Sequence, residues 1–301
     1  MNKYHQSVLL QEVVEALNVR SGGKYIDATL GGGGHAKAII EKGGLVLGID
    51  ADAEAIEFVS ENQKSKIKNQ KLRLARANFR DIDKIAKDRG FEKVRGIIFD
   101  LGLSSHQIED EKRGFSYLLS GPLDMRMDQR LGVLAKDLLN VLGKDELYEL
   151  FKKFGEEYHA RTISSAIVSA RRVAPIETSG DLVEILTKSY GFKNITDFAK
   201  SKSSKRVFQA LRIAVNDELG NLMEALPIAL TLLEPQGRLV VITFHSLEDR
   251  VVKKSFIKFE KGKKGQIITK KPILPGISEI LQNSRSKGAK LRIFEMSSQA
   301  K

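Results

Sequence analysis

The sequence predicts an α/β protein with a seven-stranded, mostly parallel sheet and a helical domain inserted into the chain. Three observations support this prediction. A strand, a glycine loop, a helix and a second strand follow one another between Tyr25 and Asp50. Further apolar runs typical of strands occur up to residue 107 and again after residue 206. Residues 108–205 show only loop and helix patterns, so we expect 1–107 and 206–301 to form one discontinuous domain around an insertion.

The first strand and the glycine loop predict a nucleoside-binding site. Gly31–Gly34 can adopt positive φ and let a ligand approach the backbone, and the helix that starts near Ala36 points its free N–H groups at that ligand. Asp50 ends the second strand about 20 residues after the glycines, where a carboxylate can accept hydrogen bonds from the hydroxyls of an adenosine ribose.

The glycines alone do not choose between a dinucleotide and S-adenosylmethionine. Asp27, an acid at the end of the first strand, favours a cationic group over a pyrophosphate. S-adenosylmethionine carries an ammonium and a sulfonium and no phosphate. We therefore expect a class I S-adenosylmethionine-dependent methyltransferase of Rossmann-like fold, with a nucleotide-dependent oxidoreductase as the alternative.

Composition excludes several chemistries. The chain of 301 residues has a net charge of +12 and a pI near 9.6, which favours a polyanionic partner such as RNA. It contains no cysteine, so disulfides, thiolate nucleophiles and iron–sulfur clusters are excluded. Neither a signal peptide nor an apolar run of the roughly 18 residues that span a bilayer is visible, so we expect a cytoplasmic location and no membrane.

The remaining elements follow from periodicity. A helix is expected within His5–Leu17, with Ser7 available as its cap, and a strand at Leu72–Ala75, after which the ring of Phe79 either flanks an adenine or joins the core. A fourth strand, Gly96–Asp100, ends in another acid and leads into a loop to Gln107. In the insertion we expect helices at Ala135–Leu142, Asp145–Phe154, Glu156–Arg172 and from Ser179 or Asp181 to Tyr190.

After the insertion, apolar residues between Phe208 and Leu226 at steps of three and four predict one long helix. Arg238–Thr243 is the fifth strand, and a helix follows from His245. Two last strands are expected at Gln266–Thr269 and Leu291–Met296, separated by an irregular basic stretch. An antiparallel final strand is more typical of a methyltransferase sheet than of a dehydrogenase sheet.

Methyl transfer to an exocyclic base amine needs hydrogen-bond acceptors at the nitrogen and a group that receives a proton. Asp100, Ser104 and Ser105, at and after the end of the fourth strand, are the predicted catalytic residues. Binding of the cofactor is an equally good role for Asp100, and a capped turn is an equal alternative for the serines. Without cysteine, methylation of cytosine C5 through a thiolate is excluded, which leaves direct transfer to nitrogen or oxygen. His245 and Glu248 have a spacing that suits a metal, but an ordinary helix start explains them, so no metal is expected.

Long motifs occur in order along nearly the whole chain, at His5–Leu10, Gly31–His35, Asp100–Gln107, Arg113–Phe115, Pro122–Asp128, Phe208–Asn216 and Phe244–Arg250. They resemble the motifs of the MraW-type ribosomal RNA methyltransferases, which methylate N4 of a cytosine in the decoding region of small-subunit ribosomal RNA. The resemblance implies S-adenosylmethionine as cofactor and a helical insertion that covers the substrate side. The cofactor site that it implies comprises Gly33, Gly34, His35, Asp50, Phe79, Asp100 and Gln107. Of these, His35 and Gln107 come from the resemblance alone.

The expected partner is small-subunit ribosomal RNA within an assembled or assembling subunit. Alternatives are another RNA or DNA amino-methyltransferase and a non-catalytic ribosome-assembly factor. The chain departs from the family's basic motif near its end at Ser284, where proline is usual, and at Lys287 and Gly288. The residues hypothesised to contact RNA are Arg113, Arg126, Arg206, His245, Lys290 and Arg292. Arg126 can equally be an internal partner of Asp124 or Asp128.

Overall fold

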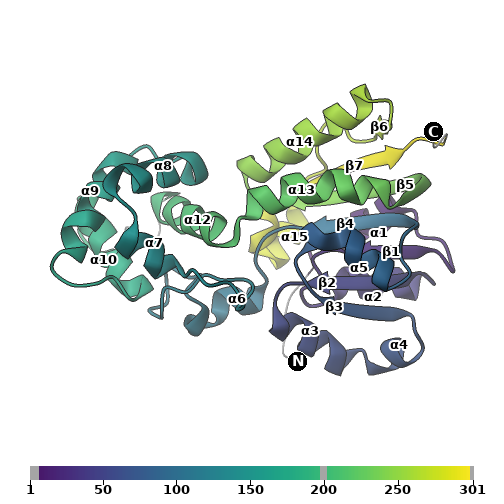
Figure 1. Ribbon diagram of the computed structural model, residues 1–301, viewed down its shortest axis with the longest axis horizontal. Coiled ribbons are helices and arrows are strands. Elements are labelled where there is room, and N and C mark those ends of the chain that lie inside the picture. Colours follow the sequence, from purple (N-terminus) through teal and green to yellow (C-terminus); the bar gives the residue numbers. More distant parts are fainter. Residues whose placement is uncertain (1–6, 197–201, 299–301) are drawn as a thin grey trace. The chain divides into compact units, whose positions relative to one another are not determined.

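The computed structural model describes residues 7–196 and 202–298 (Figure 1). The chain forms two compact units. One comprises Met1–Ser104 and Leu219–Lys301, and the other comprises Ser105–Glu218.

The first unit is built on a seven-stranded sheet of order β3-β2-β1-β4-β5-β7-β6. The neighbours β3, β2, β1, β4 and β5 pair in parallel, while β7 is antiparallel to both β5 and β6. The predicted sheet, including its antiparallel final addition, is therefore confirmed. The strands are β1 (Lys24–Asp27), β2 (Leu45–Asp50), β3 (Leu72–Arg76), β4 (Val94–Asp100), β5 (Leu233–Thr243), β6 (Gly265–Ile267) and β7 (Lys290–Met296).

Both faces of the sheet are buried, because helices cover each of them. In β5, Leu239 and Val241 join one apolar cluster with α5, α13 and α14, while Val240 and Ile242 join a second cluster with α1, α2 and α3. This alternation is the period of two that a strand imposes, and strands buried on both faces read as continuous apolar runs. The helical elements of this unit are α1 (Leu10–Leu17), α2 (Gly34–Glu41), α3 (Ala53–Asn62), α4 (Lys64–Lys68), η1 (Phe79–Asp81), α5 (Ile82–Asp88), α13 (Glu218–Thr231), α14 (Ser246–Lys261), α15 (Ile277–Gln282) and η3 (Ser284–Gly288).

The second unit is helical. Its described elements are α6 (Ser105–Glu109), η2 (Glu111–Arg113), α7 (Ala135–Val141), α8 (Lys144–Gly155), α9 (Ala160–Arg171), α10 (Ser179–Ser189) and α12 (Lys202–Asn216). Helix α12 packs against α7 and α8, so residues 206–218 belong to this unit. The observed bounds, 105–218, therefore extend beyond the insertion expected at 108–205.

The single helix expected from Phe208 to Leu226 was wrong. Asp217, at φ 46°, separates α12 from α13. Aspartate tolerates this left-handed conformation better than most residues, and the apolar spacing continues across the break without marking it.

Smaller differences concern helix starts. Ser7 does not cap α1, whose first residue is Leu10, and His5 lies outside the described residues. Thr178 caps α10 in place of Ser179 or Asp181. Its side chain accepts a hydrogen bond from the Asp181 N–H (3.1 Å), and the Asp181 carboxylate accepts one from the Thr178 N–H (2.9 Å).

The stretch expected to be irregular after β6 contains α15 and η3. Among the described helices, none is both long enough and apolar enough to span a membrane.

Candidate active site

Three aspartates end three neighbouring parallel strands: Asp27 on β1, Asp50 on β2 and Asp100 on β4. Ligands of open α/β sheets bind at the carboxyl ends of the strands. The sequence predicted this edge, and the structure brings these carboxylates to it.

The glycine loop connects β1 to α2. Gly31 (φ 49°) and Gly33 (φ 73°) are left-handed, and Gly33 occupies the N-cap of α2. A Cβ on Gly34 would lie 2.0 Å from Oγ of Ser7, so this position admits no side chain while residue 7 keeps its place. The loop therefore brings the backbone close to the strand-end acids, and the N-terminus of α2 follows directly after it.

Asp50 fixes the loop. Its Oδ2 accepts a hydrogen bond from the Gly31 N–H (2.7 Å), and its Oδ1 accepts one from the Asp52 N–H (2.9 Å). Burial raises the pKa of Asp50 to about 6, although these backbone hydrogen bonds favour the charged form. Each carboxylate oxygen keeps a second lone pair, so Asp50 can still accept hydrogen bonds from ribose hydroxyls.

Asp27 is the acid that fits a cation. Its side chain is 1% exposed, its Oδ1 accepts a hydrogen bond from the Thr29 N–H (3.3 Å), and its Oδ2 has no hydrogen-bond partner among the described residues. Burial raises the pKa of Asp27 to about 7, with Asp50 adding to the shift. A cationic group reaching this oxygen would relieve that cost, which fits the ammonium of S-adenosylmethionine and not a pyrophosphate. Neighbouring atoms must shift to admit it, because Asp27 is buried.

His35 connects the loop to the fourth strand. It is 3% exposed, and its Nε2 lies 3.1 Å from the Val8 carbonyl oxygen, so Nε2 carries a proton and donates it. Its Nδ1 lies 3.6 Å from Oδ2 of Asp100. Burial raises the pKa of Asp100 well above its ordinary value, with Asp27 and Glu248 as further causes. The ring of His35 and the carboxyl group of Asp100 therefore face each other at the end of β4.

Asp100 is also held by its backbone. Its N–H donates to the hydroxyl of Thr29 (2.6 Å), a residue that the sequence analysis did not single out. Gly102 follows at φ 111°, where a Cβ would lie 3.1 Å from the ring of Phe244. Ser104 ends the first unit, while Ser105 and the buried Gln107 lie on α6 of the second unit.

Phe79 stands just beyond β3, half-buried, with its ring packed edge-on against Phe99 at 5.5 Å between centroids. One side of the Phe79 ring thus belongs to the core. The part of the ring that stays exposed is available for contact with an adenine.

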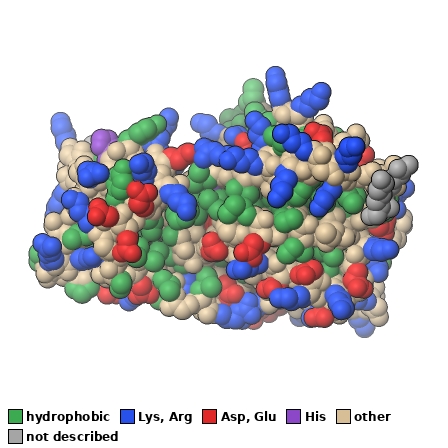
Figure 2. Space-filling view, turned by 45° about the horizontal axis from the view of Figure 1, so that its top comes forward, with side chains coloured by type: hydrophobic (Ala, Val, Ile, Leu, Met, Phe, Trp, Pro, Cys, Tyr) green, Lys and Arg blue, Asp and Glu red, His purple; other side chains and the backbone are tan. Residues whose placement is uncertain are grey.

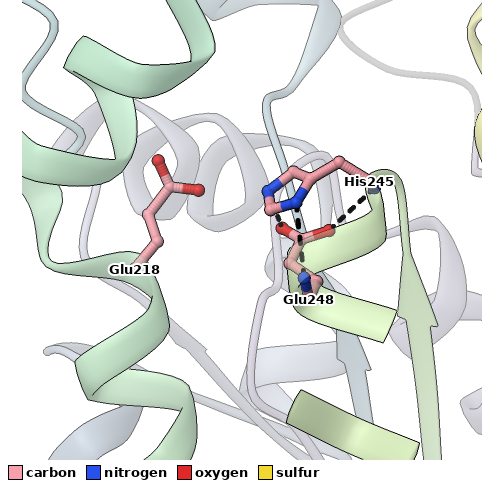
Figure 3. Close-up of side chains that lie close together, drawn as sticks. All are labelled: Glu218, His245 and Glu248. Atoms are coloured by element: carbon pink, nitrogen blue, oxygen red, sulfur yellow. Dashed lines mark hydrogen bonds and ion pairs between the residues drawn. The ribbon is translucent and has the colours of Figure 1, made fainter. Parts of the chain in front are cut away.

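His245 is the N-cap of α14, as Figure 3 shows. Its Nδ1 accepts from the Glu248 N–H (3.3 Å), and its Nε2 lies 3.2 Å from Oε1 of Glu248. The other Glu248 oxygen accepts from the Phe244 N–H (2.8 Å). This reciprocal cap is the helix start that the sequence predicted for these two side chains. Glu218, also drawn in Figure 3, belongs to the other unit and is bound by Arg212 through two hydrogen bonds of 2.8 Å.

The arginines expected to contact RNA have internal partners. Arg113 is 4% exposed and donates to the carbonyls of Arg126 (3.0 Å) and Met127 (3.2 Å). Arg126 binds both oxygens of Asp124 (2.7 and 2.8 Å), which is the internal role weighed for it.

In the first unit, Asp249 accepts hydrogen bonds from both basic residues of β7. Nε of Arg292 donates to Oδ1 (2.6 Å), and Nζ of Lys290 donates to Oδ2 (3.2 Å). Arg206, in the second unit, lies 3.9 Å from Oε2 of the buried Glu157.

Comparison with known proteins agrees with this geometry. A family model described as the MraW methylase family matches residues 2–297. Several relatives carry the name ribosomal RNA small subunit methyltransferase H, among them the three that follow. The protein of Lachnospira eligens is 42% identical over 97% of each chain, that of Brevibacillus brevis 42% identical over 97% of this chain and 98% of the relative, and that of Clostridium botulinum 43% identical over 96% and 97%.

The sheet, the glycine loop and the acidic strand ends define an S-adenosylmethionine-dependent methyltransferase of Rossmann-like fold. Because the family model spans nearly the whole chain, this chain belongs to the MraW methylase family. The oxidoreductase alternative is thereby wrong.

Proposed function

We propose that this enzyme transfers the methyl group of S-adenosylmethionine to N4 of a cytosine in the decoding region of small-subunit ribosomal RNA. The observation that carries the proposal is the set of relatives at 42–43% identity, each named ribosomal RNA small subunit methyltransferase H. The target nitrogen and its region follow from the family that the sequence motifs resemble.

The chemistry of the chain supports an amine acceptor. With no cysteine, the enzyme has no thiolate to attack cytosine C6, so transfer goes directly to a nitrogen or oxygen. An exocyclic amine that gains a methyl group must lose a proton. Asp100 and the loop that runs through Ser104 to Ser105 offer hydrogen-bond acceptors at the strand edge, and we assign them to the acceptor amine.

The cofactor supplies an electrophilic methyl group on a sulfonium. We assign its binding to the loop residues Gly33, Gly34 and His35, with Asp50 for the ribose and Phe79 for the adenine. Gln107 and Asp100 complete the set that the family implies. In this assignment Asp100 serves cofactor and acceptor together.

For the RNA, the net charge of +12 favours a polyanion. Figure 2 shows lysine and arginine side chains spread over the drawn face, and α14 contributes exposed Lys253, Lys254, Lys258 and Lys261. Arg206 and Lys290 stay partly exposed, with side-chain exposures of 30% and 37%, and remain proposed RNA contacts. We expect a structural role for the buried or paired arginines Arg113, Arg126 and Arg292, which stabilise the loops and the strand that carry them. His245 is expected to cap α14.

We propose that the enzyme acts in the cytoplasm, on an assembled or assembling subunit.

The test is transfer of labelled methyl from S-adenosylmethionine to small subunits isolated from cells lacking this protein, followed by nucleoside mass spectrometry. Label in N4-methylcytidine supports the proposal. Label in another nucleoside, or no transfer to subunits or free RNA, contradicts it. Asp100→Asn serves as the paired variant: we expect RNA binding to persist and transfer to fall at least about 100-fold. A variant that still transfers methyl at the normal rate would exclude Asp100 from the reaction.

A further inference from the structure

The helical unit carries a solvent-exposed aromatic ring. Tyr158, in the turn between α8 and α9, is 85% exposed. The guanidinium carbon of Arg206, on α12, lies 4.9 Å from the centroid of that ring. Tyrosine ordinarily buries much of its ring, so a tyrosine held in this way is a candidate for contact with a partner.

The arginine lies beside a buried acid. Its Nη1 lies 3.9 Å from Oε2 of Glu157, whose side chain is fully buried. Oε1 of Glu157 accepts a hydrogen bond from the His159 N–H (3.0 Å), on the other side of Tyr158 in the chain. The buried carboxylate thus faces the guanidinium, and the guanidinium lies over the tyrosine ring. A ligand that stacks on Tyr158 would lose less side-chain entropy than one that must order a ring without a neighbour of this kind.

The surroundings alternate cations with aromatic rings. The Lys153 ammonium lies 5.1 Å from the ring of Phe154, and the Arg161 guanidinium lies 5.1 Å from the ring of Tyr148. Exposed Lys152 and Lys205 add positive charge, while exposed Glu149 and Glu156 offset part of it. Cations interleaved with aromatic rings are typical of surfaces that bind single-stranded nucleic acid, where cations meet phosphates and rings meet bases.

We propose that Tyr158, supported by Arg206, is a stacking platform for an unpaired base of the substrate RNA other than the methylated cytosine. The inference rests on the proposed function and adds a contact to it. The exposed part of the tyrosine ring takes the π-face of the base, and the neighbouring cations take the phosphates beside it. Stacking of this kind tolerates any base, so the platform contributes affinity and placement, not sequence choice.

The experiment measures binding of a small-subunit ribosomal RNA fragment containing the target cytosine, at several salt concentrations. The proteins are the unmodified enzyme, Tyr158→Ala, Tyr158→Leu and Tyr158→Phe. We expect the alanine and leucine variants to bind at least about fivefold more weakly, and the phenylalanine variant to bind normally, because it keeps the ring. The dependence of affinity on salt should stay the same, because stacking releases no counterions. Val173→Ala, which alters another side chain of the same unit that is 90% exposed, is the matched control and should change nothing.

Several outcomes overturn the platform. Normal binding by Tyr158→Ala does so, and so does binding by Tyr158→Phe that is as weak as that of the alanine variant. Weaker binding to whole subunits with normal binding to free RNA would instead indicate a protein partner. In all of these the unmodified enzyme still methylates ribosomal RNA, so the proposed function stands. If the unmodified enzyme neither binds nor methylates ribosomal RNA, the proposed function fails and the platform fails with it.

Discussion

Nδ1 of His35 lies 3.6 Å from Oδ2 of Asp100, while Nε2 of the same ring lies 3.1 Å from the carbonyl of Val8. The histidine therefore ties the end of β4 to the segment that precedes α1, across the start of the glycine loop. A buried ring with partners on both nitrogens has one orientation available to it. This contact makes His35 a positioning residue for the acidic edge.

Replacement of His35 by leucine should destabilise the protein by ~1–3 kcal/mol, because the Val8 carbonyl and Asp100 each lose a partner inside the protein. Urea unfolding measures this as a lower midpoint at an unchanged slope. A double-mutant cycle with Asp100→Leu isolates the pair. A coupling free energy of zero would show that the two side chains act independently.

The titration of Asp27 predicts a pH dependence of stability. Its pKa in the folded protein is about 7, against an ordinary value of 3.8, so the folded state holds the proton more tightly than the unfolded state. The stability that this proton contributes is fully present below about pH 4 and is lost as the pH rises through 7. Asp27→Asn should abolish this loss of stability, which amounts to at most ~4 kcal/mol at pH 8. Urea unfolding at pH 5 and pH 8 compares the unmodified protein with Asp27→Asn, both without ligand. An equal pH dependence of the two proteins would contradict the assignment of this titration to Asp27.

Cofactor affinity should respond to pH in the opposite direction. If the ionised form of Asp27 faces the ammonium of S-adenosylmethionine, protonation weakens binding as the pH falls from 8 to 6. Calorimetric titration at these pH values should show weaker binding at pH 6 in the unmodified protein. Asp27→Asn should bind weakly at both values. A variant that keeps the full pH dependence would place the relevant titration elsewhere, with Asp50 the next candidate because its pKa is raised to about 6.

The three acids of the site were visible in the sequence because each ends an apolar run, and parallel strands bring their carboxyl ends to one edge. The contacts of His35, in contrast, depend on residues 27 and 65 positions away, which no local pattern links. The break at Asp217 was missed for a related reason, since apolar spacing reports which face of a helix is buried and not where the axis turns. Arg113 looked like a surface cation by its type, yet only the loop that folds around it supplies the carbonyls that bury it.

Gly34→Ala should destabilise the protein by ~1–3 kcal/mol through overpacking, since the new Cβ would lie 2.0 Å from Oγ and 3.2 Å from Cβ of Ser7. Ser7→Gly removes both of these atoms, so the double variant should recover most of the loss. Gly132→Ala is the matched control, because a Cβ there meets nothing within 4 Å. Thermal unfolding of the four proteins measures the effect. Failure of Ser7→Gly to rescue would show that contact with Ser7 is not the cause of the loss.

The pair Arg292–Asp249 separates a structural role from an RNA contact. Arg292 is 7% exposed, and its Nε donates to Oδ1 of Asp249 at 2.6 Å. Burial alone would raise the pKa of Asp249, but hydrogen bonds from Arg292 and Lys290 lower it below its ordinary value, which identifies an ionised, paired carboxylate. Breaking such a pair from either side leaves a charge without its main partner and should cost ~2–4 kcal/mol.

Arg292→Ala and Asp249→Ala should therefore lower stability by similar amounts, and both should leave the salt dependence of RNA binding unchanged. If Arg292 instead neutralises a phosphate, Arg292→Ala alone should reduce the slope of log affinity against log salt by about 0.7. Asp249→Ala should then bind RNA at least as well as the unmodified protein, because it removes a competing anion. Filter binding across a salt series, with urea unfolding in parallel, decides between the two roles, and we expect the structural one.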